Sequence, residues 1–275
     1  MRLAIVALSI AAATPAAAAV TFPPDASFVP LHCGGAVMTD LYRDQAGFVD
    51  ETDLVGEVAA PAALRASDAQ NLYLRIRVDA DPAPNQTARQ SSWGIELDLD
   101  GDLSTYELLI LVDGHTNKNA VELFTNHTVT LPNDPNDPAD QPAIATYLFA
   151  DNARSIAAPG VMTGNNADFF LDFALPWSDL IPAGLDHPTA THLWAGSSTS
   201  ADSLNGDLAC HDGAGGAPHL DVAASDPTTG DPGTVPPVGT GRLEGGGGCS
   251  TSGGSSTSLF ALALVVTARL RRRRR

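Results

Sequence analysis

The stretch NLYLRIRVD, residues 71–79, decides the fold class of this chain. Leucine, isoleucine and valine occupy every second position from residue 72 to residue 78, and tyrosine or arginine occupies the positions between them. Successive side chains of a strand point to opposite faces of its sheet, so this alternation predicts a β-strand with one apolar face and one polar face. An amphipathic helix would instead repeat its apolar residues at spacings of three and four.

Other segments between residues 93 and 198 share this period of two. They are WGIELDLD, YELLILVDG, AVELFTN, IATYLFA, FFLDFALPW and THLWAGSS. Turn-forming runs such as DADPAPN and PNDPNDPADQP separate them, and no window of helical length shows an amphipathic face. Several antiparallel strands with one buried face each predict an all-β fold, a single antiparallel β-sandwich of jelly-roll-like form.

Differences in composition along the chain predict a domain, a linker and an N-terminal signal segment. Residues 20–212 have the length of one β-sandwich domain. Residues 213–248 are dominated by glycine, proline, aspartate and threonine, with little apolar surface to bury, which predicts a linker. Residues 1–19 carry Arg2, a short apolar core and alanines at the A-x-A positions, which is typical of a secretory signal peptide cut after Ala19.

The C-terminal residues 249–275 contain Cys249, a polar spacer, a short apolar run at 259–268 and a cluster of arginines. As a helix, a run of this length would cover only about half of a hydrocarbon core near 30 Å thick. Arginine clusters stay on the cytoplasmic side, so an exported chain would halt here with Cys249 outside. The segment is either an uncut membrane anchor or a tail that is removed when a permanent anchor replaces it.

The ending GGGGCSTSGGSSTSLFALALVVTARLRRRRR, residues 245–275, resembles the MYXO-CTERM sorting signals. Those signals combine a glycine-rich stretch, one cysteine, a short hydrophobic helix and an arginine cluster. The resemblance implies processing by a sorting protease of the myxosortase type, with Cys249 as the modified residue. It also implies display of the folded part at the cell surface, on the outer membrane.

The globular part is similar in the order of its motifs to the family 9 carbohydrate-binding modules and to DOMON-like sandwiches. The similarity spans about residues 40–207, and its matching segments are DLYRDQAGFVDETDLVG, NLYLRIRVD, WGIELDLDGDLSTYELLILVDG and FFLDFALPWSDL. This resemblance implies a β-sandwich and makes an extracellular glycan a candidate ligand. A fold-level likeness does not by itself fix the ligand.

The charge of the chain excludes polyanionic partners. Its formal net charge is −17, and the part between residue 20 and Cys249 holds eight basic residues against 32 acidic ones. Such a surface repels nucleic acid and anionic lipid headgroups, so we expect no nucleic-acid partner. Carboxylates suit divalent cations, above all calcium outside cells.

The three cysteines have separate roles in this interpretation. Cys249 belongs to the C-terminal signal, which leaves Cys33 and Cys210 to form a disulfide in an oxidising compartment. Closing so long a loop contributes about 4 kcal/mol in the entropic account of disulfides. The pairs His32–Cys33 and Cys210–His211 also offer zinc-type ligands, but adjacent residues on a strand point to opposite faces, which disfavours a tetrahedral site.

The stretch ELDLDGDLSTYE, residues 96–107, is the richest in candidate ligands. Its acidic spacing imitates a calcium-binding loop, and Gly101 permits a sharp turn. The flanking segments read as strands, so the carboxylates would gather at a strand–turn–strand connection. The candidate calcium ligands are Glu96, Asp98, Asp100, Asp102 and Glu107. The alternative is a solvated turn in which aspartate and glycine serve turn geometry alone.

Sugar binding would need an exposed aromatic ring. Trp93 opens a core-facing strand and Trp177 follows a proline, so both are expected to be buried. Trp194 is therefore the candidate for ligand stacking, followed by Tyr73 and Tyr106. Catalytic signatures are missing from the sequence, which contains neither G-x-S-x-G nor H-E-x-x-H.

Together these features predict an exported, cell-surface-anchored, non-catalytic β-sandwich that acts as a binding or structural module and is stabilised by calcium. Two alternatives remain open. One is a carbohydrate-binding surface protein, and the other is a hydrolase of extracellular polymers.

Overall fold

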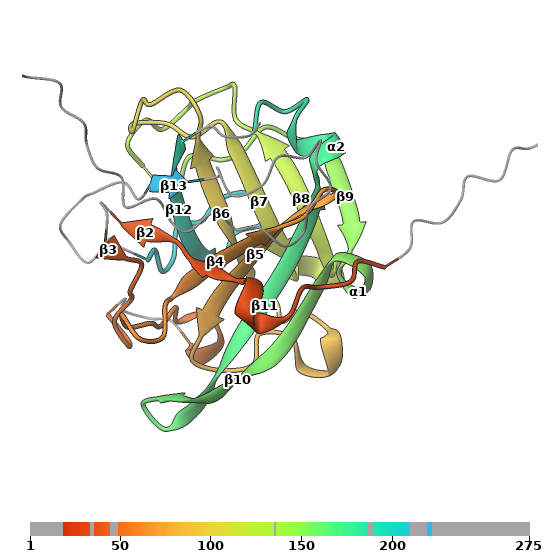
Figure 1. Ribbon diagram of the computed structural model, residues 1–275. Coiled ribbons are helices and arrows are strands. Elements are labelled where there is room, and N and C mark those ends of the chain that lie inside the picture. The colour runs from red at the N-terminus through yellow and green to blue at the C-terminus, as the bar shows by residue number, and fades with distance from the viewer. Residues whose placement is uncertain are drawn as a thin grey trace, which may run out of the picture. The chain divides into compact units, whose positions relative to one another are not determined.

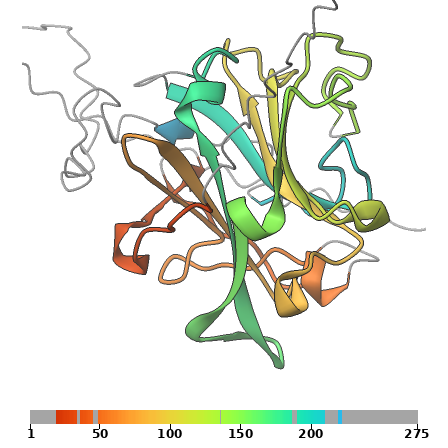
Figure 2. The same cartoon turned by 90° about the vertical axis from the view of Figure 1, so that its right-hand side faces the viewer.

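Two antiparallel β-sheets face each other across a shared apolar core (Figure 1). The computed structural model describes residues 19–33, 36–44, 49–134, 136–185, 190–209 and 219–221. Figure 2 shows the orange and green strands of the smaller sheet beside the yellow and cyan strands of the larger one. The prediction of a single antiparallel all-β sandwich is confirmed.

The smaller sheet has the strand order β1-β4-β5-β11-β10. Its strands are β1 (Val29–Pro30), β4 (Ala63–Ser67), β5 (Asn71–Val78), β11 (Asn166–Pro176) and β10 (Ala153–Thr163). The central pair is in continuous register, from Asn71 opposite Pro176 to Val78 opposite Phe169. Strand β5 is the segment whose alternation predicted the fold class.

The larger sheet has the order β3-β2-β13-β12-β6-β7-β8-β9. Its strands are β3 (Ala36–Val37), β2 (His32–Cys33), β13 (His219–Asp221), β12 (Ala190–Ser198), β6 (Ser92–Asp98), β7 (Leu108–Asp113), β8 (Ala120–Thr125) and β9 (Ala145–Leu148). Strands β6 to β9 form an up-and-down meander. Strand β13 falls inside the stretch 213–248 that composition assigned to a linker, and it pairs with β12.

Helical structure among the described residues is short. It comprises α1 (Phe149–Asn152), α2 (Trp177–Leu180) and 3₁₀ turns at Asp25–Ser27, Asp50–Thr52, Pro84–Gln86 and His115–Asn117. None of these helices has the length and apolar character needed to cross a lipid bilayer. The apolar run 259–268 lies outside the described residues.

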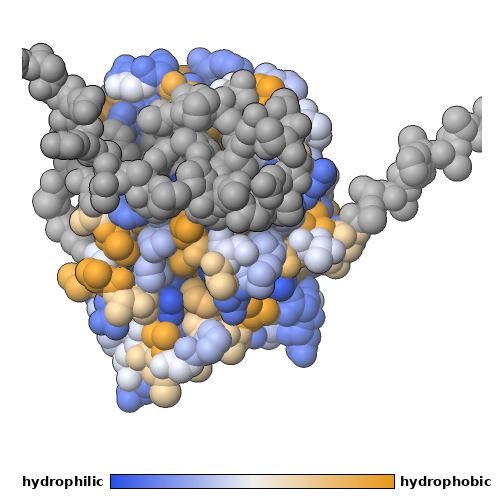
Figure 3. Space-filling view, viewed as in Figure 1, coloured by the Kyte–Doolittle hydropathy of each residue, from blue (hydrophilic) through white to orange (hydrophobic). Residues whose placement is uncertain are grey.

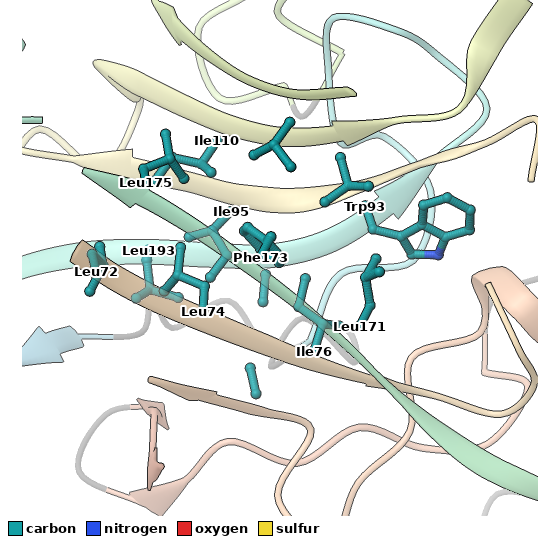
Figure 4. Packing of buried hydrophobic residues seen from close by; sticks show 14 of the residues in the cluster. Leu72, Leu74, Ile76, Trp93, Ile95, Ile110, Leu171, Phe173, Leu175 and Leu193 are labelled. Atoms are coloured by element: carbon teal, nitrogen blue, oxygen red, sulfur yellow. The ribbon is translucent and has the colours of Figure 1, made fainter. Parts of the chain in front are cut away.

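The core forms where the apolar faces of the two sheets meet (Figure 4). Leu72, Leu74 and Ile76 of β5 project into it, as the alternation predicted. Trp93 and Ile95 enter it from the opposite sheet, on β6. Trp93 is fully buried, and its indole N–H donates to the backbone oxygen of Glu51 at 2.9 Å. Trp177 is also buried, so both expectations about these tryptophans are confirmed.

The expectation of one buried face per strand is wrong for β5, which is buried on both faces. Arg75 is 1% exposed, and its guanidinium carbon lies 3.9 Å from the ring centre of Phe28 and 4.3 Å from that of Phe170. Tyr73 packs in the same outer layer as Phe28. The reason is that the segment before β1 lies across the outer face of the smaller sheet, where its aromatic residues cover the arginines.

A buried ion-pair network accompanies this outer layer. Asp172 on β11 is fully buried, and its two oxygens accept Nε and Nη2 of Arg75 at 2.6 and 2.9 Å. Arg154 of β10 donates its Nε to the same carboxylate at 2.8 Å. Asp25, more than half exposed, adds a contact to Arg75 Nη2 at 2.9 Å. Because Asp172 is bound in a fork and neutralised by two arginines, its burial is compensated.

The outer face of the larger sheet is covered as well. Leu109, Leu111 and Phe124 on the outer face of β7 and β8 pack with residues from segments outside the strands, which are Tyr106, Ala139, Leu204 and Leu208. On the described part of the face in Figure 3, hydrophobic and hydrophilic residues are interspersed. Large exposed apolar side chains, such as Leu41, Val58 and Met162, sit on separate segments.

Candidate functional site

The connection between β6 and β7 gathers carboxylates as the sequence predicted. One carboxylate oxygen from each of Asp98, Asp100 and Glu107 lies within 4.8 Å of the other two. Asp98 Oδ1 accepts the backbone N–H groups of Asp100 at 3.0 Å and Gly101 at 2.7 Å. Gly101 has φ +86°, a left-handed conformation that a residue with a side chain adopts at a cost. The turn therefore depends on the aspartate and the glycine together.

Electrostatics at this turn favour a cation. Burial raises the pKa of Glu107, the N–H of Leu99 lowers it, and the neighbouring charges of Asp100 and Asp98 raise it further. On the other side of Asp98, the ring Nδ1 of His192 lies 2.8 Å from Oδ2. Calcium takes six to eight oxygen ligands, which these three carboxylates could begin to supply, with water or backbone carbonyls completing the shell.

Three of the five predicted calcium ligands are thus brought together, and two are placed elsewhere. Asp102 is exposed, and its Oδ1 accepts the N–H and the hydroxyl of Ser104 at 3.1 and 2.7 Å. Glu96 lies on the same sheet face as Asp98, two residues earlier, but its carboxyl group lines a cavity. A second acidic group forms where Asp40 and Asp44, both in the stretch DLYRDQAGFVDETDLVG, meet Asp207.

That cavity, here called the outer-face cavity, has a volume of about 260 Å³. It lies on the side of the larger sheet that faces away from the core. Its floor comes from β6 and β12, and its walls come from the β6–β7 connection and the loop between β8 and β9. The lining residues are Glu96, Leu103, Ser104, Thr105, Tyr106, Asn133, Asp134, Asp137, Trp194 and Leu208.

Strand register explains why Glu96 and Trp194 meet at the floor. Glu96 stands opposite Trp194 where β6 pairs with β12. Ile95 and Leu97 point into the core, so alternation turns Glu96 outward. Residues directly opposite each other on antiparallel strands have Cβ atoms about 5 Å apart. The carboxyl group and the half-buried indole ring therefore share one side of the sheet on rigid elements.

Glu96 is the least compensated carboxyl group of the cavity. It is 3% exposed, and one hydrogen bond reaches it from the described residues, from the N–H of Leu204 to Oε1 at 3.3 Å. Burial raises the pKa of Glu96 to about 8, against the effect of the Leu204 N–H, and the charge of Asp137 raises it further. No described basic residue lies close enough to oppose this shift.

Asp137 has the opposite character. Its Oδ2 accepts Nδ2 of Asn126 at 2.9 Å, and its Oδ1 accepts the N–H and hydroxyl of Thr130, both at 2.8 Å, and the N–H of Leu131 at 2.7 Å. Burial pushes the pKa of Asp137 up, but these hydrogen bonds outweigh burial and hold the pKa below its ordinary value. Tyr106 donates its hydroxyl to the Asp137 backbone oxygen at 2.7 Å.

Asp137 therefore organises the loop that walls the cavity, a role that the sequence did not indicate when it marked PNDPNDPADQP as a turn-forming run. The residue is 3% exposed. Its position could not be inferred from PNDPNDPADQP, where three aspartates look alike. Glu96 carried a usable signal, because alternation along WGIELDLD already places it opposite the core-facing residues. Trp194, the residue predicted for ligand stacking, lines the cavity, and the stacking itself stays a prediction.

The cysteine predictions stay predictions. Cys33 belongs to β2, of which the backbone is described. Cys210 and Cys249 lie outside the described residues, as do the predicted signal peptide, apart from Ala19, and the arginine cluster.

Comparison with known proteins adds no relative to this picture. No family model matches the chain, and neither the curated proteins nor the solved structures contain a significant match. The resemblances to the MYXO-CTERM signals and to family 9 carbohydrate-binding modules therefore stay predictions.

Proposed function

We propose that this chain is an exported, surface-displayed, non-catalytic β-sandwich module that binds an extracellular glycan in the outer-face cavity. The observation that carries the proposal is the pairing of Trp194 with Glu96 at the floor of a cavity, both held on paired strands. An aromatic ring beside a polar group is the combination that saccharide recognition needs, since the ring packs on apolar C–H groups and the polar group binds hydroxyls.

The display part of the proposal is supported by the two ends of the sequence. An N-terminal segment of signal-peptide composition and a C-terminal cysteine, apolar run and arginine cluster would hold the sandwich outside the cell. Mass spectrometry of native material tests this part directly. It should find the chain beginning after Ala19, the arginine cluster removed and Cys249 modified.

A hydrolase is the second candidate, and Glu96 is the observation that favours it. A buried carboxyl group with a raised pKa is the form a general acid takes in glycoside hydrolysis. Hydrolysis also needs a second carboxylate that is free to act as base or nucleophile. Asp137 has both oxygens engaged by the loop that it organises, so it does not fill that role.

Replacing Trp194 with alanine should lower glycan affinity at least about tenfold, because aromatic anchors in pockets contribute most of the binding energy at such sites. The measurement is retention on a glycan array followed by titration calorimetry of the retained glycans. Chromogenic glycosides and esters should not be turned over by the unaltered protein.

The matched control is Tyr42→Ala, which removes a partly buried aromatic side chain that does not line this cavity. Its glycan affinity should equal that of the unaltered protein. Equal losses in both variants would contradict binding at Trp194, and turnover that disappears in Glu96→Gln would favour the hydrolase.

Calcium should raise the melting temperature through the group of Asp98, Asp100 and Glu107. A ligand that binds only the folded state at one hundred times its dissociation constant adds about 2.7 kcal/mol, which corresponds to roughly 5–10 °C for a domain of this size. The measurement is thermal unfolding in EDTA and at increasing calcium concentrations.

Asp100→Asn should reduce the calcium shift, because it removes the charge of one gathered carboxylate. Asp102→Asn should keep the shift, since the Asp102 carboxylate stands outside the group. A melting temperature that ignores both calcium and chelator would show that the turn is a solvated acidic turn.

A further inference from the structure

The outer-face cavity has a one-sided charge. Three of its lining residues, Glu96, Asp134 and Asp137, are acidic, and no lysine, arginine or histidine of the described part of the chain lines it. The chain as a whole carries a net charge of −17, so the field around the cavity has the same sign. An anionic ligand would be repelled by these carboxylates.

The three acids differ in how well the protein satisfies them. Asp137 accepts four hydrogen bonds from its own loop. Asp134 is exposed, and its Oδ1 accepts the N–H and Nδ2 of Asn136 at 2.9 and 2.7 Å. Glu96 is 3% exposed, yet its carboxyl group accepts a single hydrogen bond from the described residues, from the N–H of Leu204 at 3.3 Å.

The buried carboxyl group of Glu96 has no partner of opposite charge among the described residues that line the cavity. Burying a carboxylate is costly unless a cation or several hydrogen bonds compensate it, as Arg75 and Arg154 do for Asp172 on the other sheet. The contrast between the two sheets is informative. One buried acid is neutralised within the protein, while the other faces a cavity that holds no described basic residue.

We infer that the outer-face cavity binds an amine-bearing ligand, with the ammonium group against Glu96 and the apolar face of the ligand against Trp194. The inference rests on the proposed binding function and adds the chemical class. Glu96 and Trp194 stand opposite each other in register, so a single small ligand can contact both. An ammonium group forms a charge-assisted hydrogen bond with a carboxylate and is attracted to the electron-rich face of an indole ring.

The size of the cavity limits the ligand. Its volume of about 260 Å³ lies at the small end of ligand sites. One sugar ring or a short alkylamine fits this description better than an extended chain buried along its whole length. An amino sugar combines the required ammonium group with a ring whose C–H face packs on tryptophan.

The test compares three β-1,4-linked trimers that differ only in the substituent at C2 of each ring. They are the glucosamine trimer (ammonium), the N-acetylglucosamine trimer (acetamide) and cellotriose (hydroxyl). Titration calorimetry of the full chain should give the glucosamine trimer the highest affinity, at least about tenfold above cellotriose, as one charge-assisted contact supplies. The neutral acetamide trimer should not exceed cellotriose by as much.

Glu96→Gln should remove this preference while leaving the melting temperature close to that of the unaltered protein. Asp102→Asn removes an exposed carboxylate that does not line the cavity and should preserve the preference. The inference of an amine-bearing ligand would be overturned if cellotriose bound as tightly as the glucosamine trimer, or if the preference survived Glu96→Gln. Either result would leave the proposed binding function in place. Absence of binding by all three trimers, together with an empty glycan array, would overturn both.

Discussion

Replacing Asp172 with alanine is expected to lower the free energy of unfolding by about 3–5 kcal/mol, because removing one member of a buried ion pair leaves the other buried charge uncompensated. Arg75, 1% exposed between two aromatic rings, would lose both of its short contacts to Asp172. Domains of this kind have a total stability of roughly 5–15 kcal/mol. The variant should therefore lie near the limit of folding, and chemical denaturation will measure the loss.

Asp25→Ala is the matched control, since Asp25 contacts the same arginine at the surface. Its side chain is 56% exposed. Because solvent screens the exposed Asp25 carboxylate, its contact with Arg75 should contribute only about 0–1 kcal/mol, and this variant should unfold almost as the unaltered protein does. The double variant Arg75→Met, Asp172→Leu should be more stable than Asp172→Ala alone, because no fully buried charge is left unpaired. Arg154 and Asp25 also lose a partner in the double variant, but both side chains reach solvent. Similar losses from Asp25→Ala and Asp172→Ala would contradict the assignment of stability to the buried pair.

Trp93→Ala is expected to lower the free energy of unfolding by a similar amount, about 3–5 kcal/mol. The side chain is fully buried, and in Figure 4 it lies in the same cluster as Leu171 and Ile76 of the opposite sheet. Its removal opens a cavity where the two sheets meet and leaves the backbone oxygen of Glu51 without its 2.9 Å hydrogen bond. Denaturant unfolding, followed by circular dichroism, gives the measurement.

Two further variants separate the contributions. Trp93→Phe keeps most of the apolar contact and removes the indole N–H, so its loss should be smaller, about 1–2 kcal/mol. Trp194→Ala removes the same side chain from a half-buried position outside the main core and should cost less than half as much as Trp93→Ala. If Trp194→Ala proved the more destabilising of the two, the location of the core would be in error.

The strands with clear alternation were predictable from the sequence. Residues 71–79, 93–100, 106–114 and 120–126 each match a strand of the structure to within one or two residues at its ends, because their apolar residues form one face of the shared core. Strand β10 was not predicted. It is an edge strand that contains Pro159 and Gly160, with a register shift between Ala157 and Met162. Edge strands tolerate such residues, so their sequences lose the pattern.

The sequence pointed to residues of the candidate site, but it did not indicate which of them lie together in space. The stretch 96–107 supplies both the gathered carboxylates and part of the cavity lining, and Trp194, the residue predicted for ligand stacking, also lines the cavity. What the sequence could not reveal is that Glu96 is paired across β6 and β12 with Trp194, while Asp98 turns to Asp100 and Glu107. Strand register and the path of the 126–144 loop decide which of these side chains lie together. Neither can be inferred from the spacing of residues along the sequence.

The covering of both sheets from outside has a consequence for how this protein tolerates sequence change. In an ordinary two-layer sandwich, every second position of a strand faces water and accepts many amino acids. Strands β5, β6 and β7 have almost no such positions, since nearly every residue of each is buried. Positions that accept many amino acids are therefore expected mainly in the edge strands and connecting loops. The two sheets lie between two outer apolar layers, so substitutions in their central strands should rarely be tolerated.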